Sequence, residues 1–346
     1  MEQHSSAVAP SPLPPDAQIL QMGLACYISQ ALYVAAKLGI ADRLTDSNKT
    51  AADLAVATGT HERSLYRVLR ALSSVGVFSE TEGRKFSNTP LSETLRTDAP
   101  NSTRDFIMFL GEEPHWRNLG YTIYSVKTGN PAWQHVHGEP VFPYLFNTNK
   151  DLGEIFNRAM ISFSHQDIPP LLSAYDFAGI GTLADIGGGY GHLLAAVLKK
   201  YPAMKGVLFE APQLIDGARG LINAEGVADR VEFVAGDFRK EIPVRADAYM
   251  LKHIIHDWYD DTNQSILKNI HNHMPDNGRV LIVDSIIPPG DEPHLKKILD
   301  IEMLIAPGGV ERTEQEFERL LNDSSFRLNR IIHTNAPISI LEGVKA

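Results

Sequence analysis

The chain has 346 residues, 43% hydrophobic and 21% charged, which is typical of a folded globular protein and excludes a disordered or fibrous one. Single cores stop growing at roughly 250–300 residues, so we expect more than one domain. The net charge of −10 argues against a nucleic-acid polymer as partner, and the single cysteine, Cys26, allows no internal disulfide. With no signal peptide and no uncharged run of about 18 apolar residues recognised, we expect a cytoplasmic protein without a membrane segment.

The chain is expected to begin with a disordered tail and a long helix. Residues 5–15 are small and rich in proline, which predicts an extended, disordered tail over residues 1–15. From residue 16 a helix is predicted, because apolar residues recur at helical spacing as far as Leu38. These apolar residues lie on more than one face of the predicted helix. The helix therefore needs a packing partner beyond its own small domain.

A helix, a turn at Gly59 and a second helix over residues 50–72 are followed by two short predicted strands, at 77–80 and 84–87. This order is that of a winged helix-turn-helix, which often binds DNA. The first hundred residues hold 9 Lys and Arg against 10 Asp and Glu, however, so they lack a basic surface for phosphates. We therefore interpret residues 16–100 as a winged-helix-like dimerisation domain.

Residues 101–175 are predicted to form a helical bridge, rich in aromatic side chains, that contributes to a substrate pocket. Core packing accounts for most of these aromatic residues. The functional interpretation is that a minority line a pocket for a flat, apolar ligand. The candidates for that wall are Phe109, Trp116, Met160 and Phe163.

Residues 176–346 alternate β-rich runs with helical segments, which predicts an α/β fold, a doubly wound domain around a largely parallel sheet. Strands are expected at 182–186, 205–210, 231–235, 246–252 and 279–286, and helices at 191–200, 214–224, 260–274 and 313–322. Such sheets bind their ligands at the carboxyl ends of the strands, so the chemistry should be found there.

The first of these strands leads into a glycine loop that opens a helix. Asp185 lies in the strand, and Gly187, Gly189 and Gly191 form G-x-G-x-G. Glycines are required where the backbone must approach a ligand closely. The spacing differs from the G-x-G-x-x-G of dinucleotide sites, and no Lys-Ser/Thr pair follows to make a phosphate-binding P-loop.

Two further strand ends bring acidic residues to the same crevice. Glu210 ends the second strand, 25 positions after Asp185, where a carboxylate can accept hydrogen bonds from ribose hydroxyls. Asp237 and Phe238 follow the third strand and add a carboxylate and a flat apolar ring. The sequence offers no Arg or Lys cluster here for a pyrophosphate. A cationic, phosphate-free adenosine ligand fits this acidic lining, which points to S-adenosylmethionine.

Four motifs in order give the chain a specific resemblance. They are Leu-Ala-Asp-Ile-Gly-Gly-Gly-Tyr-Gly at 183–191, Gly-Asp-Phe at 236–238, Leu-Lys-His-Ile-Ile-His-Asp-Trp at 251–258 and Pro-Gly-Gly-Val-Glu-Arg-Thr at 307–313. The chain resembles the metal-independent small-molecule O-methyltransferases, which include plant caffeate-type enzymes and bacterial natural-product-tailoring relatives. The resemblance covers nearly the whole chain. It implies a Rossmann-like catalytic domain over residues 176–346 and a homodimer formed through the winged-helix-like domain.

The resemblance also implies roles for individual residues, although the family often has Asp at the position of Glu210. Asp185 is predicted to be part of the cofactor site. Gly187, Gly189 and the neighbouring loop would contact the amino-acid end of S-adenosylmethionine. Glu210 would contact the ribose, Asp237 and Phe238 the adenine, and Lys252 the polar end of the cofactor.

Methyl transfer to oxygen requires the acceptor hydroxyl to lose its proton, and a histidine with a pKa near neutrality is the usual base. His256 follows the strand at 246–252 on its ligand-binding side and matches the family's His-Asp-Trp, so it is the candidate base. Asp284 and Glu311 match the acidic partners that orient such a ring, and the sequence does not choose between them. The expected acceptor is an aromatic hydroxyl, because a phenol with a pKa near 10 is within reach of an imidazole.

His253 stands where plant relatives often carry tryptophan, which makes this pocket wall smaller and more polar. Two histidines without an accompanying carboxylate or cysteine pattern are poor indicators of zinc, so no metal is expected at His253 and His256. Two other classes stay open: a transcriptional regulator that senses S-adenosylmethionine, and a related decarboxylase or hydroxylase that uses the same cofactor. Neither a nucleic acid nor a membrane is expected as a partner.

Overall fold

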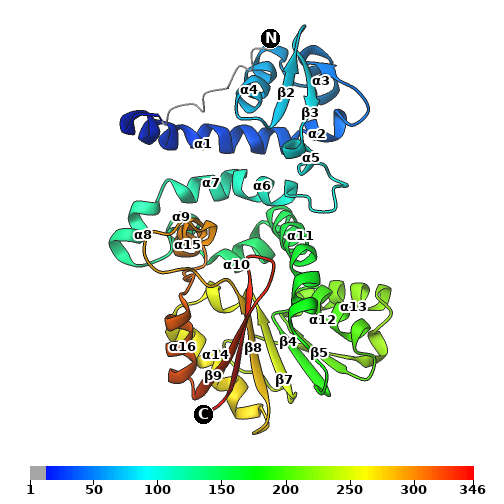
Figure 1. Ribbon diagram of the computed structural model, residues 1–346, viewed down its shortest axis with the longest axis vertical. Helices are drawn as coiled ribbons and strands as arrows, with labels where there is room; N and C mark the ends of the chain where they lie inside the picture. The colour runs from blue at the N-terminus through cyan, green and yellow to red at the C-terminus, as the bar shows by residue number, and fades with distance from the viewer. Residues whose placement is uncertain (1–12) are drawn as a thin grey trace, which may run out of the picture. The chain divides into compact units, whose positions relative to one another are not determined.

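The computed structural model describes residues 13–346, and the chain forms two compact units, one ending at Glu112 and the other beginning at Glu113 (Figure 1). Most of the predicted tail, residues 1–15, lies outside the described residues. Each unit has its own hydrophobic core.

The first unit is a helical domain with a small sheet. The Thr50 hydroxyl and the Asp53 carboxylate form a capping box that starts α3, and β3 pairs antiparallel with both β1 and β2. The predicted helices and both wing strands are therefore present, and β1 is a further strand that was not predicted. The elements of the first unit are α1 (Pro15–Lys37), α2 (Ile40–Arg43), β1 (Lys49–Thr50), α3 (Ala51–Thr58), α4 (Glu62–Ser74), β2 (Phe78–Thr81), β3 (Lys85–Asn88), α5 (Pro90–Glu93) and α6 (Arg104–Gly111).

Helix α1 has a long apolar surface. Residues 17–36 carry no charge, and by length and composition alone the helix could cross a bilayer, with a mean hydropathy of 1.4 over its most apolar window. The expectation that the chain contains no such run was therefore wrong. Because helices of soluble proteins pass the same test, the finding does not by itself assign the chain to a membrane. The large apolar residues exposed on α1 are Ile19, Leu20, Met22, Leu24 and Tyr27.

The second unit begins with short helices and continues as an α/β domain. Its first part comprises α7 (Glu113–Leu119), α8 (Thr122–Thr128), α9 (Ala132–His137), α10 (Val141–Pro143), the π-helix η1 (Tyr144–Thr148) and α11 (Lys150–Ala174). The sheet and its helices follow as β4 (Thr182–Ile186), α12 (His192–Lys200), β5 (Lys205–Glu210), η2 (Pro212–Leu214), α13 (Ile215–Ala224), η3 (Ala228–Arg230), β6 (Val231–Ala235), β7 (Ala248–Lys252), η4 (Ile255–Asp257), α14 (Asp260–His273), β8 (Arg279–Asp284), α15 (Leu295–Ile305), α16 (Glu314–Asp323), β9 (Phe326–His333) and β10 (Ser339–Lys345).

The seven strands lie in the order β6-β5-β4-β7-β8-β10-β9. The first five are parallel, whereas β10 runs antiparallel to β8 and to β9. The predicted α/β fold class and its parallel strands are confirmed. Strands β9 and β10 and helix α15 were not predicted from the sequence.

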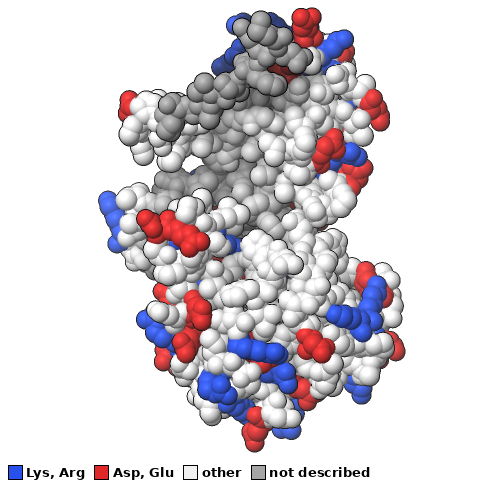
Figure 2. Space-filling view, viewed as in Figure 1, with Lys and Arg blue, Asp and Glu red and all other residues white. Residues whose placement is uncertain are grey.

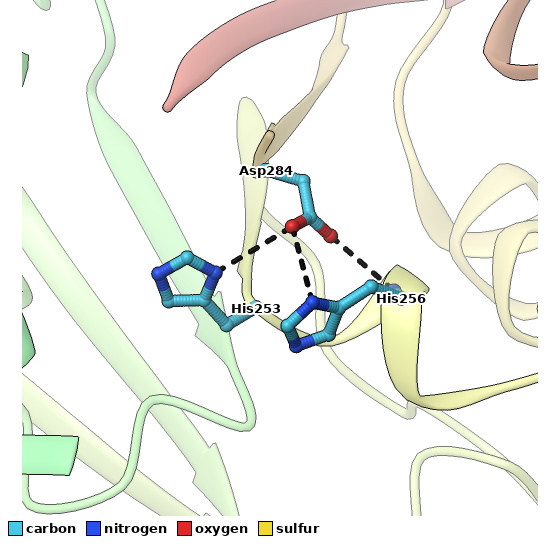
Figure 3. A group of neighbouring side chains, drawn as sticks. All are labelled: His253, His256 and Asp284. Atoms are coloured by element: carbon cyan, nitrogen blue, oxygen red, sulfur yellow. Dashed lines mark hydrogen bonds and ion pairs between the residues drawn. The ribbon is translucent and has the colours of Figure 1, made fainter. Parts of the chain in front are cut away.

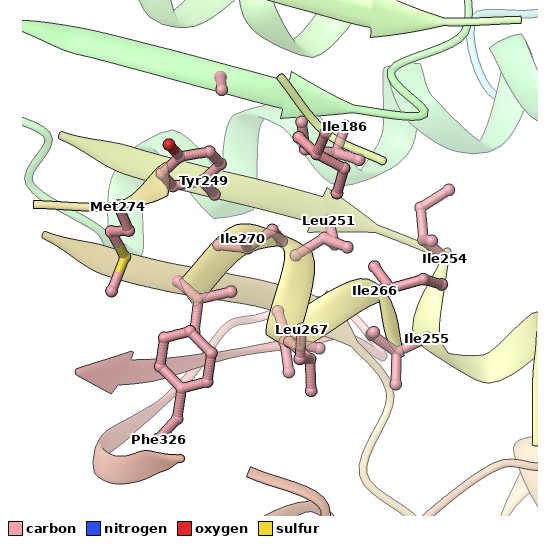
Figure 4. Packing of buried hydrophobic residues seen from close by; sticks show 14 of the residues in the cluster. Ile186, Tyr249, Leu251, Ile254, Ile255, Ile266, Leu267, Ile270, Met274 and Phe326 are labelled. Carbon is pink, nitrogen blue, oxygen red and sulfur yellow. The ribbon is translucent and has the colours of Figure 1, made fainter. Parts of the chain in front are cut away.

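Alternate residues of each strand point to opposite faces of the sheet, and both faces are covered by helices. On one face Tyr249 and Leu251 of β7 belong to a buried cluster with Ile266 and Ile270 of α14 (Figure 4). On the other face Met250 belongs to a second cluster, to which α11, α12 and α13 contribute. Such double coverage holds the strands firmly, so the loops at their carboxyl ends start from fixed positions.

Candidate active site

The glycine loop after β4 forms one wall of the crevice. Gly187 and Gly189 have φ values of +69° and +59°, in the left-handed region that favours glycine. A Cβ at Gly187 would lie 2.5 Å from the Ile254 side chain, whereas one at Gly189 would meet nothing within 4 Å. The loop is thus packed on one side and open on the other, as a ligand cradle requires.

Two buried carboxylates lie beneath this loop. Glu210 accepts hydrogen bonds from the backbone N–H groups of Gly189, at 2.8 Å, and Ala211, at 2.6 Å. Burial raises the pKa of Glu210, against the effect of those two donors. Asp185 is 2% exposed, and burial together with the charge of Glu210 raises its pKa to about 7. This part of the site would therefore be stabilised by a cation.

The side chains predicted for the adenine end are held by neighbours. The Asp237 carboxylate pairs with Arg239 through contacts of 2.8 and 2.9 Å, and Arg239 lowers the pKa of Asp237. The Arg239 guanidinium lies over the Trp258 ring, and Phe238 meets the same ring with centroids 6.3 Å apart. These flat surfaces are suited to a purine.

Helix α11 closes the other side of the crevice. Lys252, at the end of β7, binds Asp167 at 2.9 Å and Ser164 at 3.4 Å, both on α11. A hollow of about 70 Å³ lies between this helix and the glycine loop, and it is lined by Asn157, Met160, Ile161, Ser164, Gly188, Gly189, Tyr190 and Leu214. An open glycine cradle, buried carboxylates and a flat aromatic wall together fit an adenosine-bearing cation such as S-adenosylmethionine.

His256 lies in η4, directly after the carboxyl end of β7, and is 9% exposed. Its Nδ1 lies 3.2 Å from Glu311 Oε1 and 3.4 Å from Asp284 Oδ1, and its backbone N–H donates to Asp284 Oδ2 at 3.3 Å. Its Nε2 lies 3.6 Å from Asp257 Oδ1. Both predicted acidic partners therefore contact the ring, so neither is the sole orienting group.

The proton affinity of His256 differs from the expected near-neutral value. Burial alone lowers its pKa, but the charges of Asp284, Asp257 and Glu311 outweigh that effect and raise the pKa to about 9. In the cofactor-free protein at pH 7 the ring is therefore an imidazolium. A nearby sulfonium would oppose this charge, so cofactor binding is expected to bring the pKa down.

The loop that carries His256 is fixed by buried hydrogen bonds. The Val310 N–H donates to the carbonyl of His256 at 2.9 Å, and Arg312, only 2% exposed, donates to the carbonyls of Ile255 and Trp258. A Cβ on Gly309 would lie 1.9 Å from the His256 carbonyl oxygen. The Pro-Gly-Gly segment can therefore approach this loop only because it has no side chain at Gly309.

His253 lies between two carboxylates, Asp167 and Asp284. Its Nε2 is 3.1 Å from Asp167 Oδ2, and its Nδ1 is 3.5 Å from Asp284 Oδ1. Among the described residues, His253, His256 and Asp284 offer ligand atoms within 4.8 Å of one another, a spacing that a metal ion could bridge. Figure 3 shows both Nδ1 atoms directed at the same Asp284 oxygen, which occupies the point where they converge. The expected absence of a metal stays a prediction.

The residues predicted for the substrate wall are divided between the two units. Phe109 is buried on α6 of the first unit, whereas Trp116, on α7, and Met160 and Phe163, on α11, are half-buried in the second. Sequence reasoning missed Asp167 and Lys296, which contact His253 and Glu311 at 3.1 and 3.2 Å. Neither residue lies in a motif, so no local signal could have identified it.

These features agree with comparisons to known proteins, which show that the chain belongs to the S-adenosylmethionine-dependent O-methyltransferase family. Residues 116–327 match the O-methyltransferase domain, and residues 20–98 match the O-methyltransferase dimerisation domain. The predicted family is confirmed, and the chain is a small-molecule methyltransferase.

The chain is 40% identical to a phenazine O-methyltransferase of Lysobacter antibioticus, over 94% of each chain. It is 38% identical to the mitomycin biosynthesis 6-O-methyltransferase of Streptomyces lavendulae, over 91% of this chain and 90% of that one. The crystal structure of LaPhzM superposes with a TM-score of 0.90 at 39% identity, covering 96% of this chain and all of the other. More distant relatives include a riboflavin-type N,N-dimethyltransferase of Streptomyces davaonensis, at 34% identity, and an aclacinomycin 10-hydroxylase of Streptomyces purpurascens, at 31%.

Proposed function

We propose that this protein transfers a methyl group from S-adenosylmethionine to a phenolic hydroxyl of a small aromatic molecule, with His256 as general base. The observation that carries the proposal is the imidazole at the carboxyl end of β7, with Nδ1 at 3.2 Å from Glu311 and 3.4 Å from Asp284. S-adenosylmethionine supplies the electrophilic methyl group. The carboxylates hold the ring, and its Nε2 takes the phenolic proton as the oxygen attacks.

A base favours oxygen over nitrogen as the acceptor atom. A phenol with a pKa near 10 is a weak nucleophile until it loses its proton, whereas a neutral aromatic amine already has a free electron pair. The phenazine relative at 40% identity and the mitomycin relative at 38% are named for methylation of oxygen. The riboflavin-type relative at 34% and a phenazine-1-carboxylate N-methyltransferase at 31% are named for methylation of nitrogen. His256 and the two closer relatives together support O-methylation.

We infer that the chain acts as a homodimer in the cytoplasm. The dimerisation-domain match at residues 20–98 includes most of α1, whose exposed apolar residues need a cover in water. On the face in Figure 2, basic and acidic side chains of the described residues are interspersed over the second unit, without a continuous basic surface. The winged-helix-like region would carry any DNA contact, and its 9 Lys and Arg against 10 Asp and Glu in the first hundred residues do not support the regulator alternative.

The proposal is tested by incubating the protein with S-adenosylmethionine labelled in its methyl group and a panel of hydroxylated and aminated phenazines and quinones. We expect labelled methyl ethers from at least one phenol, unchanged by a chelator such as EDTA. N-methyl products alone, or a hydroxylated or decarboxylated product without methyl transfer, would contradict the assignment. Activity lost with EDTA and restored by a metal would contradict the metal-independent chemistry.

The pKa of about 7 at Asp185 predicts that cofactor affinity depends on pH. A bound cation favours the ionised carboxylate, so binding should release a proton below about pH 7, and affinity should rise roughly tenfold between about pH 5.5 and 8. Calorimetry in buffers of different ionisation enthalpy measures both effects. S-adenosylhomocysteine, which lacks the sulfonium charge, is the matched control and should show a smaller dependence. Asp185→Asn should remove it, and a pH-independent affinity in the unmodified protein would refute the explanation.

A further inference from the structure

His253 and His256 share one carboxylate oxygen. Both Nδ1 atoms point at Asp284 Oδ1, from 3.5 and 3.4 Å, and the two rings stack with centroids 5.3 Å apart and planes inclined by 24° (Figure 3). Asp284 is fully buried, so this oxygen is shielded from bulk solvent. Whatever charge His253 carries therefore changes how strongly Asp284 holds a proton on His256.

His253 is placed between carboxylates from two different elements. Its Nε2 lies 3.1 Å from Asp167 Oδ2 on α11, and its buried Nδ1 faces Asp284 Oδ1 at 3.5 Å. The contact with Asp167 therefore holds the ring with its Nδ1 directed at the oxygen that His256 also contacts.

The backbone also holds His253 in an uncommon conformation. Its φ of +54° lies in the left-handed region, which residues with a side chain rarely adopt. Its N–H donates to the Val283 carbonyl at 3.1 Å, which fixes this turn to the end of β8. Such conformations persist where the surrounding structure determines them, and they concentrate at functional sites.

We propose that His253 is a positioning residue for methyl transfer: its Nδ1 shares Asp284 Oδ1 with His256, weakens the hold of that carboxylate on the His256 proton, and so keeps the base able to accept the acceptor's proton. The proposal rests on the assignment of His256 as base. The charged groups around the two rings are Lys252 on β7, Asp167 on α11, Asp257 in η4, Asp284 at the end of β8, Lys296 on α15 and Glu311 before α16.

The test compares three variants of the full-length protein: His253→Gln, which places a neutral group beside Asp284, His253→Lys, which places a cationic donor there, and Asp167→Asn, which removes the carboxylate at Nε2. His273→Gln, on the exposed end of α14, is the matched control. The first readout is kcat against pH with both substrates saturating. The second is an NMR titration of His256 in substrate-free protein labelled at histidine, which does not depend on activity.

We expect His253→Gln to shift the acid limb of the kcat profile to higher pH by about one unit. At pH values below the limb kcat should fall about tenfold, and at pH values above it kcat should be unchanged. The His256 titration should move in the same direction. Asp167→Asn should give a smaller shift of the same sign, with a raised KM for S-adenosylmethionine because Lys252 also loses its partner. His253→Lys and His273→Gln should keep the original limb.

A merely structural role would lower kcat equally at every pH, and a role in acceptor specificity would change the acceptor KM alone; either result would overturn the proposal. Stoichiometric zinc in the purified protein that disappears in His253→Gln would also overturn it. If His256→Gln retains activity, the base assignment itself fails. An unshifted His256 titration in His253→Gln, with His256→Gln inactive, refutes only the role of His253.

Discussion

Replacing His256 with glutamine should lower kcat by about 10²- to 10⁴-fold at pH 9, where the unmodified ring has lost much of its extra proton. Glutamine keeps a polar side chain of similar reach but cannot accept the phenolic proton. The rate of the unmodified protein should rise with pH through an acid limb, because only neutral imidazole accepts a proton. The variant should lose that limb. Initial rates from about pH 6 to 10, with both substrates saturating, measure both effects.

Two controls make the His256 result interpretable. At pH 9, where much of the opposing charge on His256 is already lost, the dissociation constant for S-adenosylmethionine should stay within a few-fold, since His256 does not belong to the proposed cofactor residues. His273→Gln removes an exposed histidine from α14 and should leave the profile unchanged. Full activity of His256→Gln on every accepted phenol would show that bringing the substrates together suffices, and that acceptors bind as phenolates.

Replacing Gly309 with alanine should abolish methyl transfer and destabilise the second unit by several kcal/mol. The added Cβ would lie 1.9 Å from the His256 carbonyl oxygen and 2.5 Å from the Asp257 carbonyl carbon, both of which are backbone atoms that cannot rotate away. The η4 turn and the segment that holds Glu311 must separate. Circular dichroism melts and kcat measurements report the two losses.

Gly220→Ala is the matched control for the same chemical change. A Cβ at Gly220, inside α13, meets nothing within 4 Å, and alanine is the better helix former by about 1 kcal/mol. That variant should be fully active and equally or more stable. If Gly309→Ala behaves like Gly220→Ala, the approach of the Gly309 backbone to η4 is not required for the site.

The parts of the fold that sequence reasoning predicted are those with local signals. An apolar strand that leads into glycines, such as β4 before Gly187 and Gly189, can be recognised from about ten residues of sequence. The strands β9 and β10 were missed because β9 has a single buried residue, Phe326, and the exposed Asn329 and Arg330 interrupt its alternation. Their place in the sheet depends on contacts that no local pattern encodes.

The site was predictable in its motif residues and not in its electrostatics. His256 and Glu311 stand in recognisable motifs, so both could be named before the fold was known. Asp167 lies 86 positions before His253 on a helix without a motif, and only folding brings the two together. The proton affinity of His256 is the sum of burial and three carboxylates at separations of 3.2–3.6 Å, which a sequence does not contain.

The position of β10 in the sheet has a consequence for how the protein matures. This strand follows β9 in the chain, yet it lies between β8 and β9, and its first residue, Ser339, pairs with Asp284. The edge of β8 that carries Asp284 is therefore unpaired until residues 339–345 have been synthesised. The five parallel strands can assemble earlier, but the candidate site is completed only when this later strand joins the sheet.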